Sequence, residues 1–240
     1  MEVRIFNNAD EIAVACADIF TELLKKQPEC ILGLATGASP VKTYNELIRR
    51  YNEGEISFAK VKTFNLDEYC NLPRDDKNSY YTFMHENLFN SVDIKEENVH
   101  IPDGNAADPE AHAKSYDAMI DAEGGVDIQL LGIGTNGHIG FNEPSDTFSD
   151  GTFKVKLTDS TIESNSIYFD DDTMPRYALT MGINSIMKAK KIVPIATGAS
   201  KAEAIKATIQ GEVTPMVPAS VLQNHKDAIL LIDKEAAKLL

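Results

Sequence analysis

Short apolar runs alternate with amphipathic segments along nearly the whole chain, and this alternation limits the possible folds more than any other feature. Five runs have the length and composition of buried strands: Cys30–Ala35, Val61–Leu66, Val126–Leu131, Lys191–Ala196 and Ala228–Ile232. Helical patterns occupy Ala9–Lys26, Pro40–Tyr51, Asn78–Phe89, Pro109–Ala122 and Ser200–Gln210. Strand–helix alternation predicts an α/β fold, with a doubly wound, mainly parallel, Rossmann-like sheet flanked by helices.

We expect residues 1–240 to form a single domain, because no Ser-rich, Pro-rich or low-complexity linker divides the chain. A chain of 240 residues is also within the range of single α/β domains. One position conflicts with a regular sheet. Pro194 lies inside the fourth apolar run, and proline lacks the N–H that a strand ladder uses, so we expect a kink or irregularity there.

The charge balance excludes several classes of partner. The chain carries 37 acidic and 23 basic residues, a net charge of −14, which repels phosphate backbones and anionic lipid surfaces, so we expect neither nucleic acid nor membrane as a partner. The beginning of the chain has no basic region followed by an apolar stretch, so we expect no signal peptide. Three cysteines without CxxC spacing predict neither a disulfide framework nor a zinc site, and they favour a cytoplasmic location.

A five-residue pattern, Ala-Thr-Gly-Ala-Ser, occurs twice, at Ala35–Ser39 and at Ala196–Ser200. Each copy follows an apolar run and precedes a helical pattern. Two interpretations remain open. Gly and Ser are common in turns between a strand and a helix, so the echo can be purely structural. Alternatively, both turns bind an anion with backbone N–H groups at the positive end of a helix.

The segment Gly132–Pro144 holds four glycines within nine residues directly after a strand. It does not match a dinucleotide-binding fingerprint, because Pro144 interrupts the helix that should follow. His138 lies in this loop, two residues after Asn136 and five before Glu143. A carboxylate that orients an imidazole is a common way to build an acid–base group, so we favour catalysis over a structural role for His138.

A second candidate base is the pair Asp67–Glu68, which follows the second apolar run. The alternatives are a helix cap or a solvated acidic pair, and metal binding lacks a set of suitably spaced ligands. The other histidines have no comparable context, and we expect structural or surface roles for His85, His100, His112 and His225. The acidic run Asp170–Asp172 is typical of a solvated loop.

Three motifs together resemble those of glucosamine-6-phosphate deaminases. They are Leu-Ala-Thr-Gly-Ala-Ser-Pro at 34–40, Phe-Asn-Leu-Asp-Glu-Tyr at 64–69 and Gly-Thr-Asn-Gly-His-Ile-Gly-Phe-Asn-Glu-Pro at 134–144. The similarity runs from about residue 3 to about residue 233. It implies that glucosamine 6-phosphate and water are converted to fructose 6-phosphate and ammonia, with no metal or organic cofactor.

The resemblance also implies a role for each matching residue. His138 opens the sugar ring, Asn136 and Glu143 orient its imidazole, and Asp67 moves a proton from C2 to C1. The positions that match the phosphate site of the family are Thr36, Gly37, Ala38, Ser39 and Lys201.

The chain departs from the family pattern at three places. Asn136 replaces an Asp found in some members, Phe153 and Val155 replace the basic residues with which regulated members hold an activator phosphate, and Ile167 replaces an arginine that contacts substrate phosphate. We therefore expect a non-allosteric enzyme whose phosphate recognition depends on the first turn and on Lys201.

Three alternative functions remain. Galactosamine 6-phosphate differs at one hydroxyl whose partner the sequence does not reveal. A 6-phosphogluconolactonase-like hydrolase needs no C2 base, so Asp67 argues against it. A non-catalytic sugar-phosphate sensor is normally fused to a DNA-binding helix-turn-helix. The family includes monomers and larger assemblies, so a homo-oligomer remains open.

Overall fold

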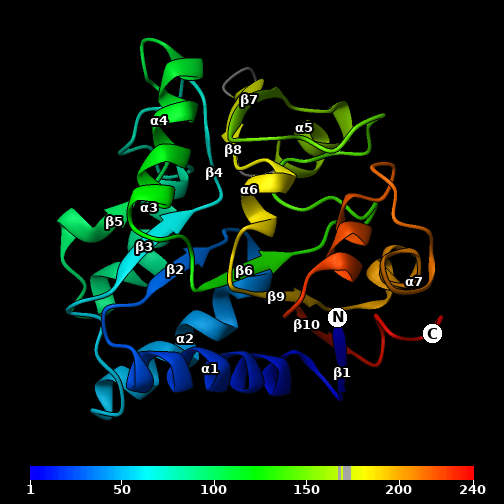
Figure 1. The fold of residues 1–240 in the computed structure, drawn as a ribbon, viewed down its shortest axis with the longest axis horizontal. Coiled ribbons are helices and arrows are strands. Elements are labelled where there is room, and N and C mark those ends of the chain that lie inside the picture. Colours follow the sequence, from blue (N-terminus) through cyan, green and yellow to red (C-terminus); the bar gives the residue numbers. More distant parts are fainter. Residues whose placement is uncertain (167–168, 170–173) are drawn as a thin grey trace.

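The computed structural model describes residues 1–166, 169 and 174–240. A sheet of seven strands crosses the molecule between layers of helices (Figure 1). Its strand order is β1-β10-β9-β6-β2-β3-β5, and neighbouring strands are parallel. A second, antiparallel sheet has the order β4-β8-β7. The large sheet and its helices confirm the predicted fold class.

The large sheet is built from β1 (Glu2–Phe6), β2 (Ile31–Leu34), β3 (Lys62–Asn65), β5 (Val99–His100), β6 (Ile128–Gly132), β9 (Lys191–Ala196) and β10 (Ile229–Asp233). The small sheet contains β4 (Asp67–Tyr69), β7 (Phe153–Lys156) and β8 (Tyr177–Thr180). The helices are α1 (Ala9–Lys26), α2 (Ala38–Asn52), α3 (Tyr80–Asn87), α4 (Pro109–Ala122), α5 (Asp159–Ser166), α6 (Ile183–Met187) and α7 (Ala202–Gln210). Four 3-10 helices are η1 (Phe89–Ser91), η2 (Glu96–Asn98), η3 (Ala199–Lys201) and η4 (Pro218–Asn224).

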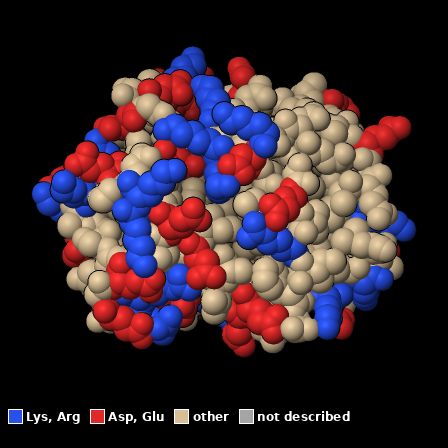
Figure 2. All heavy atoms as spheres, turned by 60° about the horizontal axis from the view of Figure 1, so that its bottom comes forward, with Lys and Arg blue, Asp and Glu red and all other residues tan. Residues whose placement is uncertain are grey.

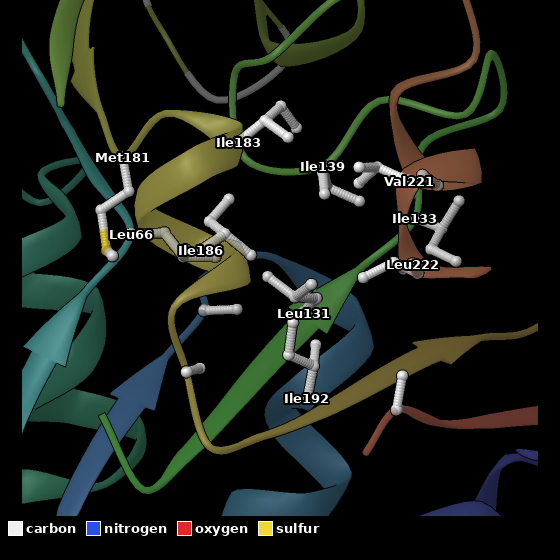
Figure 3. Close-up of a cluster of buried hydrophobic side chains, with 14 of the residues drawn as sticks. Leu66, Leu131, Ile133, Ile139, Met181, Ile183, Ile186, Ile192, Val221 and Leu222 are labelled. Atoms are coloured by element: carbon white, nitrogen blue, oxygen red, sulfur yellow. The ribbon is translucent and has the colours of Figure 1, made fainter. Parts of the chain in front are cut away.

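Two apolar cores lie on the two faces of the large sheet. On one face, Phe20 of α1 and Tyr44 of α2 are fully buried against strand residues such as Leu32. On the other face, Leu131 of β6 and Ile192 of β9 pack with residues of α6 and η4 (Figure 3). Each fully buried Leu or Ile side chain contributes about 1.5–3 kcal/mol through its removal from water. Both faces of the strands are therefore apolar, as the continuous runs in the sequence predict.

Helix α1 begins where its sequence indicates. The side chain of Asn8 accepts hydrogen bonds from the backbone N–H groups of Asp10 at 2.9 Å and Glu11 at 3.0 Å. These donors have no partner within the helix, so the cap satisfies them. The two acidic side chains also lie in the first turn, where the helix dipole favours negative charge.

The expected irregularity at Pro194 occurs in the hydrogen-bond ladder and not in the strand itself. β9 runs unbroken, and Pro194 pairs in register with Leu131 of β6. On the other side, Ile192 bridges to Ala228, and pairing with β10 resumes only where Ile195 meets Leu231. Alternate residues of a parallel strand donate their N–H groups to opposite neighbouring strands. The N–H that proline lacks at position 194 would point toward β10, where the pairing is interrupted.

Strand order reverses between β2 and β6, which are neighbours in the sheet. From β2 the chain proceeds outward through β3 to β5, whereas β6, β9 and β10 proceed toward the opposite edge. In open α/β sheets, ligands bind beyond the carboxyl ends of the strands at such a reversal. The loops that follow β2 and β6 are therefore the expected place for a ligand.

Charges of both signs share the surface. Figure 2 shows Lys and Arg interspersed with Asp and Glu over much of the visible face. Among the described residues, pairs such as Lys42 with Asp10 and Arg49 with Glu46 hold opposite charges together. None of the helices in the described part of the chain is long and apolar enough to cross a membrane.

Candidate active site

A cavity of about 210 Å³ opens at the carboxyl ends of β2 and β6. Residues from several distant segments line it, and Ile133, Phe141 and Leu66 provide apolar wall. Its polar side chains are Thr36, Ser39, Asp67, Tyr80, His138, Thr161 and Lys201. The cavity thus brings together the segments that the sequence placed at strand ends.

The first Ala-Thr-Gly-Ala-Ser turn has the features of an anion site. The hydroxyl of Tyr44 donates to the carbonyl oxygen of Ala35 at 2.6 Å and accepts from the N–H of the same residue at 3.2 Å, which holds the turn in place. Gly37 adopts a φ of +90°, and it precedes α2 without a side-chain cap. The N–H groups at the start of α2, from Ala38 onward, are therefore available to a ligand.

The second copy of the pattern has a different arrangement. The N–H of Gly198 donates to both carboxylate oxygens of Asp233 at 3.0 Å. A carboxylate of the protein therefore occupies this N–H group, whereas the first turn has no such partner among the described residues. The idea of two equivalent anion-binding turns is not supported. Lys201, at the end of η3, is the group that this segment brings to the cavity wall.

Asp67 lies at the junction of the two sheets, as the first residue of β4 directly after β3 and Leu66. It is 6% exposed. Burial, and then the negative charge of Glu68, raise the pKa of Asp67 to about 8, whereas a hydrogen bond from the Thr36 hydroxyl lowers it. A carboxylate with a raised pKa is a stronger base than an ordinary one, which suits the abstraction of a proton from carbon.

The glycine-rich loop allows the backbone to pass close to these groups. At Gly140, with a φ of +57°, an added Cβ would lie 3.5 Å from the Asp67 carboxylate and 3.0 Å from the Thr180 hydroxyl. At Gly134, an added Cβ would lie about 2.1 Å from the imidazole of His138. The N–H of Gly134 also donates to the carbonyl oxygen of His138 at 2.9 Å, which closes the loop.

A short relay of side chains orients His138. The Asn136 amide donates to Oε2 of Glu143 at 2.8 Å, so its oxygen faces the histidine. That oxygen accepts from the N–H of His138 at 3.1 Å and lies 2.7 Å from Nδ1 of its ring. Since an amide oxygen only accepts, Nδ1 carries the proton of the neutral ring. Nε2 is then left as a proton acceptor.

Glu143 acts on His138 mainly through Asn136. Its Oε2 is 3.6 Å from Nδ1 of His138, too far for a hydrogen bond. Its Oε1 accepts from the Thr161 hydroxyl of α5 at 2.7 Å. Burial lowers the pKa of His138, the charge of Glu143 raises it, and Lys201 lowers it, with a net downward shift. The imidazole is therefore neutral at neutral pH.

Two cavity residues were missed by the sequence reasoning. Thr161 carries no local signal, because only the fold brings α5 to Glu143. Tyr80 is the first residue of α3, and its ring lies parallel to that of Phe141 with 6.2 Å between ring centroids. The sequence predicted a helix over Asn78–Phe89, and in the structure Ser79 caps α3 by accepting from the N–H of Thr82 at 3.0 Å, so that the helix begins at Tyr80.

The remaining histidines and the three cysteines do not line the cavity. The four histidines outside the cavity make local contacts: His85 with Glu96, His100 with Phe64, His112 with Asp103 and His225 with Ala189. All three cysteines are free and buried. Within the described ranges, no group of three or more His, Cys, Asp or Glu side chains is placed to hold a metal ion.

A second cavity of about 280 Å³ lies on the other side of Glu143. Phe153 and Val155 of β7 face into it together with Phe148 and Ile183. The two positions at which regulated members of the resembled family are expected to carry basic side chains are thus occupied by apolar wall. Two other segments discussed from the sequence, Ile167 and the acidic run 170–172, lie outside the described residues.

Comparison with known proteins agrees with this geometry. Residues 7–231 match the family model described as glucosamine-6-phosphate isomerases/6-phosphogluconolactonase. The chain is 50% identical to glucosamine-6-phosphate deaminase from Clostridium perfringens over the full length of both chains. It is 54% identical to the enzyme of that name from Lysinibacillus sphaericus, with 94% of this chain and 95% of the relative covered.

Solved structures give the same relationship. A monomeric glucosamine-6-phosphate deaminase matches over the whole of both chains, with a TM-score of 0.97 and 43% identity. A 6-phosphogluconolactonase from Trypanosoma cruzi matches with a TM-score of 0.79 at 19% identity, which shows a shared fold. The chain belongs to the glucosamine-6-phosphate isomerase/6-phosphogluconolactonase family.

Proposed function

We propose that the chain is a glucosamine-6-phosphate deaminase, which converts glucosamine 6-phosphate and water to fructose 6-phosphate and ammonia. The observation that carries this proposal is a buried carboxylate, Asp67, in the same cavity as an oriented neutral imidazole, His138, beside an open helix N-terminus. Relatives of about 50% identity carry the same name. Lactone hydrolysis has no use for a base at C2, so the placement of Asp67 argues against it.

The first step is ring opening, and His138 performs it. Nε2 of the imidazole, unprotonated in the favoured tautomer, accepts the proton of the anomeric hydroxyl and returns a proton to the ring oxygen as the C1–O5 bond breaks. Asn136 and Glu143 keep the ring in the orientation that this exchange requires. A positioned acid–base group of this kind contributes about 10²–10⁴-fold to the rate.

Asp67 performs the second step. Its carboxylate takes the proton from C2 of the open-chain amino sugar, which gives an enolamine, and then delivers a proton to C1. The product is the imine of fructose 6-phosphate. Addition of water to C2 and loss of the nitrogen complete the reaction, so that the carbon skeleton is isomerised and ammonia leaves. No external oxidant or reductant takes part.

The substrate phosphate binds at the first turn. Backbone N–H groups of Gly37 and Ala38, the hydroxyl of Ser39 and the ammonium group of Lys201 provide its donors, while Thr36 lies beside them with its hydroxyl donating to Asp67. The partner is thus a small amino-sugar phosphate. We place the enzyme in the cytoplasm, which suits its three free, buried thiols.

Ammonia release from glucosamine 6-phosphate and from galactosamine 6-phosphate tests the activity and the choice of epimer together. Asp67→Asn then tests the base: we expect binding to survive and exchange of the C2 hydrogen with solvent deuterium to stop. Exchange at the wild-type rate in this variant would show that another group is the base. Faster release from galactosamine 6-phosphate would favour the epimer as substrate.

A further inference from the structure

Glu68 is a buried acidic residue for which the proposed reaction provides no role. It follows Asp67 on β4 and is also 6% exposed. Successive side chains of a strand point to opposite sides, so Asp67 faces the cavity while Glu68 faces α3. Its carboxylate accepts three backbone N–H groups: from Tyr69 at 2.8 Å, Tyr80 at 3.0 Å and Tyr81 at 2.9 Å.

Two of these three donors belong to the first turn of α3. The first N–H groups of a helix have no partner within it, and a carboxylate at this end is favoured by the helix dipole. Ser79 caps the same helix by accepting from the N–H of Thr82. Helix α3 therefore has two caps, and Glu68 links its backbone N–H groups to the strand that carries Asp67.

The link has a consequence in the cavity, because Tyr80 is both a partner of Glu68 and part of the cavity wall. The Tyr80 ring packs beside Tyr69, with 4.7 Å between centroids, and parallel to Phe141. The Tyr80 hydroxyl donates to that of Tyr69 at 3.3 Å. A movement of the α3 N-terminus would therefore shift the wall that faces Asp67.

We propose that Glu68 is a positioning residue for the deamination: its carboxylate joins the start of α3 to β4, so that Tyr80 closes the cavity beside Asp67, and it places a negative charge directly behind Asp67 on the strand. The proposal rests on the proposed role of Asp67 as the C2 base. Glu68 itself does not touch the substrate, because it lies on the opposite side of the strand.

Several groups set the electrostatic environment of this pair. Glu68 acts on Asp67 through its charge from the opposite side of the strand, and the charge of Asp67 in turn raises the pKa of the Tyr44, Tyr80 and Tyr116 hydroxyls. His138 and Lys201 line the same cavity as Asp67. Burial raises the pKa of Glu68, while its three N–H donors and the charge of Arg74 lower it, with a net upward shift. Glu68 is the only carboxylate that raises the pKa of Asp67 among the groups acting on it in the described residues.

Glu68→Gln tests the proposal, because it keeps the shape of the side chain and removes its charge. We expect the acidic limb of kcat/KM against pH to move to lower pH, on the order of one pH unit, since a like charge near a carboxyl group is lost. At the plateau we expect kcat to fall about tenfold for two reasons. Asp67 becomes a weaker base, and the amide introduced by Glu68→Gln has one oxygen to accept the N–H groups of α3, where the Glu68 carboxylate has two. Protonation of the substrate amine affects both enzymes equally and cancels in the comparison.

Two further variants separate charge from structure. Ser79→Ala weakens the same end of α3 without altering charge. We therefore expect a lower melting temperature and no shift in the acidic limb of kcat/KM. Glu68→Asp keeps the charge on a shorter side chain, so we expect lower kcat with the limb near its wild-type position. If Glu68→Gln does not fold, the loss of kcat in Glu68→Asp still tests whether the length of this side chain positions α3. An unmoved limb in Glu68→Gln, or an equal shift in Ser79→Ala or Glu68→Asp, would overturn the proposal.

The same measurements distinguish this inference from the proposed function. Absence of ammonia release by the wild-type enzyme, or continued C2 exchange in Asp67→Asn, would reject the function. If the wild-type enzyme releases ammonia and Asp67→Asn loses exchange, an unmoved limb in Glu68→Gln rejects only the role of Glu68.

Discussion

One glycine determines where the imidazole of His138 can lie. A Cβ at Gly134 would lie about 2.1 Å from the ring, and the backbone there is not in the left-handed region. Gly134→Ala should therefore displace the ring without straining the backbone. We expect kcat on the closed sugar to fall by about 10²–10⁴-fold, the contribution of one acid–base group, with a much smaller loss on an open-chain substrate analogue.

His138→Gln provides the comparison for this prediction. Since both changes remove the same group from the reaction, the double variant should be no slower than the slower single one. Multiplied losses in the double variant, or equal losses on the closed and open-chain substrates, would show that Gly134 acts elsewhere or that His138 does not open the ring.

The raised pKa of Asp67 also predicts a pH dependence of stability. In the unfolded chain this carboxyl ionises near pH 3.9, whereas in the folded chain its pKa is about 8. Between these values the unfolded state binds fewer protons, so stability falls as pH rises, and the full cost is present above pH 8. Asn has no proton to lose, so Asp67→Asn should stabilise the protein increasingly from pH 5 to pH 8.

Melting temperatures of the two proteins across this range provide the measurement. Each 1 kcal/mol shifts the melting temperature by about 2–4 °C for a chain of this size, so a difference that grows by several degrees is expected. A difference that stays constant from pH 5 to pH 8 would mean that Asp67 titrates normally.

Sequence reasoning located the residues of the site better than it explained their contacts. Asp67 and His138 stand out locally, because each follows an apolar strand and carries chemistry at its end. Thr161 and Tyr80 do not, since contacts with Glu143 and Glu68 depend on segments that are 18 and 12 positions away. For Glu68, the sequence left a helix cap as one alternative, and the structure confirms that alternative.

The prediction of elements succeeded where burial on both faces leaves a continuous apolar run. All five such runs form strands of the large sheet, and the five helical patterns form α1, α2, α3, α4 and α7. The edge strand β1 was missed because it is partly exposed and β5 because it has only two residues, and the three strands of the small sheet were missed as well. These strands depend on a partner from elsewhere in the chain more than on their own pattern.

The two similar turns should differ in function because their contacts differ. At the second turn Asp233 accepts from the N–H of Gly198, so we expect Lys201 to be the main contribution of this turn to phosphate binding. A charged hydrogen bond contributes roughly 1.5–3 kcal/mol, so Lys201→Ala should raise KM about 10–150-fold with little change in kcat. Lys206→Ala is the matched control, because Lys206 is exposed on α7, the helix that follows Lys201, and lies outside the cavity lining.

Measured KM values for glucosamine 6-phosphate decide this prediction. An unchanged KM in Lys201→Ala would mean that the second turn is only a structural connection between β9 and α7. Equal increases in both variants would instead indicate a general effect of positive charge on an enzyme with a net charge of −14.

At the scale of the whole molecule, the prediction concerns regulation. Activation by a second sugar phosphate requires a second site whose affinity differs between two states of the protein. The second cavity offers Phe153 and Val155, which cannot form charge-assisted hydrogen bonds with a phosphate. We therefore expect hyperbolic dependence of the rate on glucosamine 6-phosphate, and no activation by N-acetylglucosamine 6-phosphate.

The assembly state bears on the same prediction, because cooperativity between active sites needs more than one copy of the chain. The structural relative of 43% identity is described as monomeric. Light scattering at the enzyme concentrations of the kinetic assay gives the mass alongside the rate curve. A sigmoidal curve that becomes hyperbolic when N-acetylglucosamine 6-phosphate is added would contradict the prediction. Such a curve would require an activator phosphate site built from groups other than Phe153 and Val155.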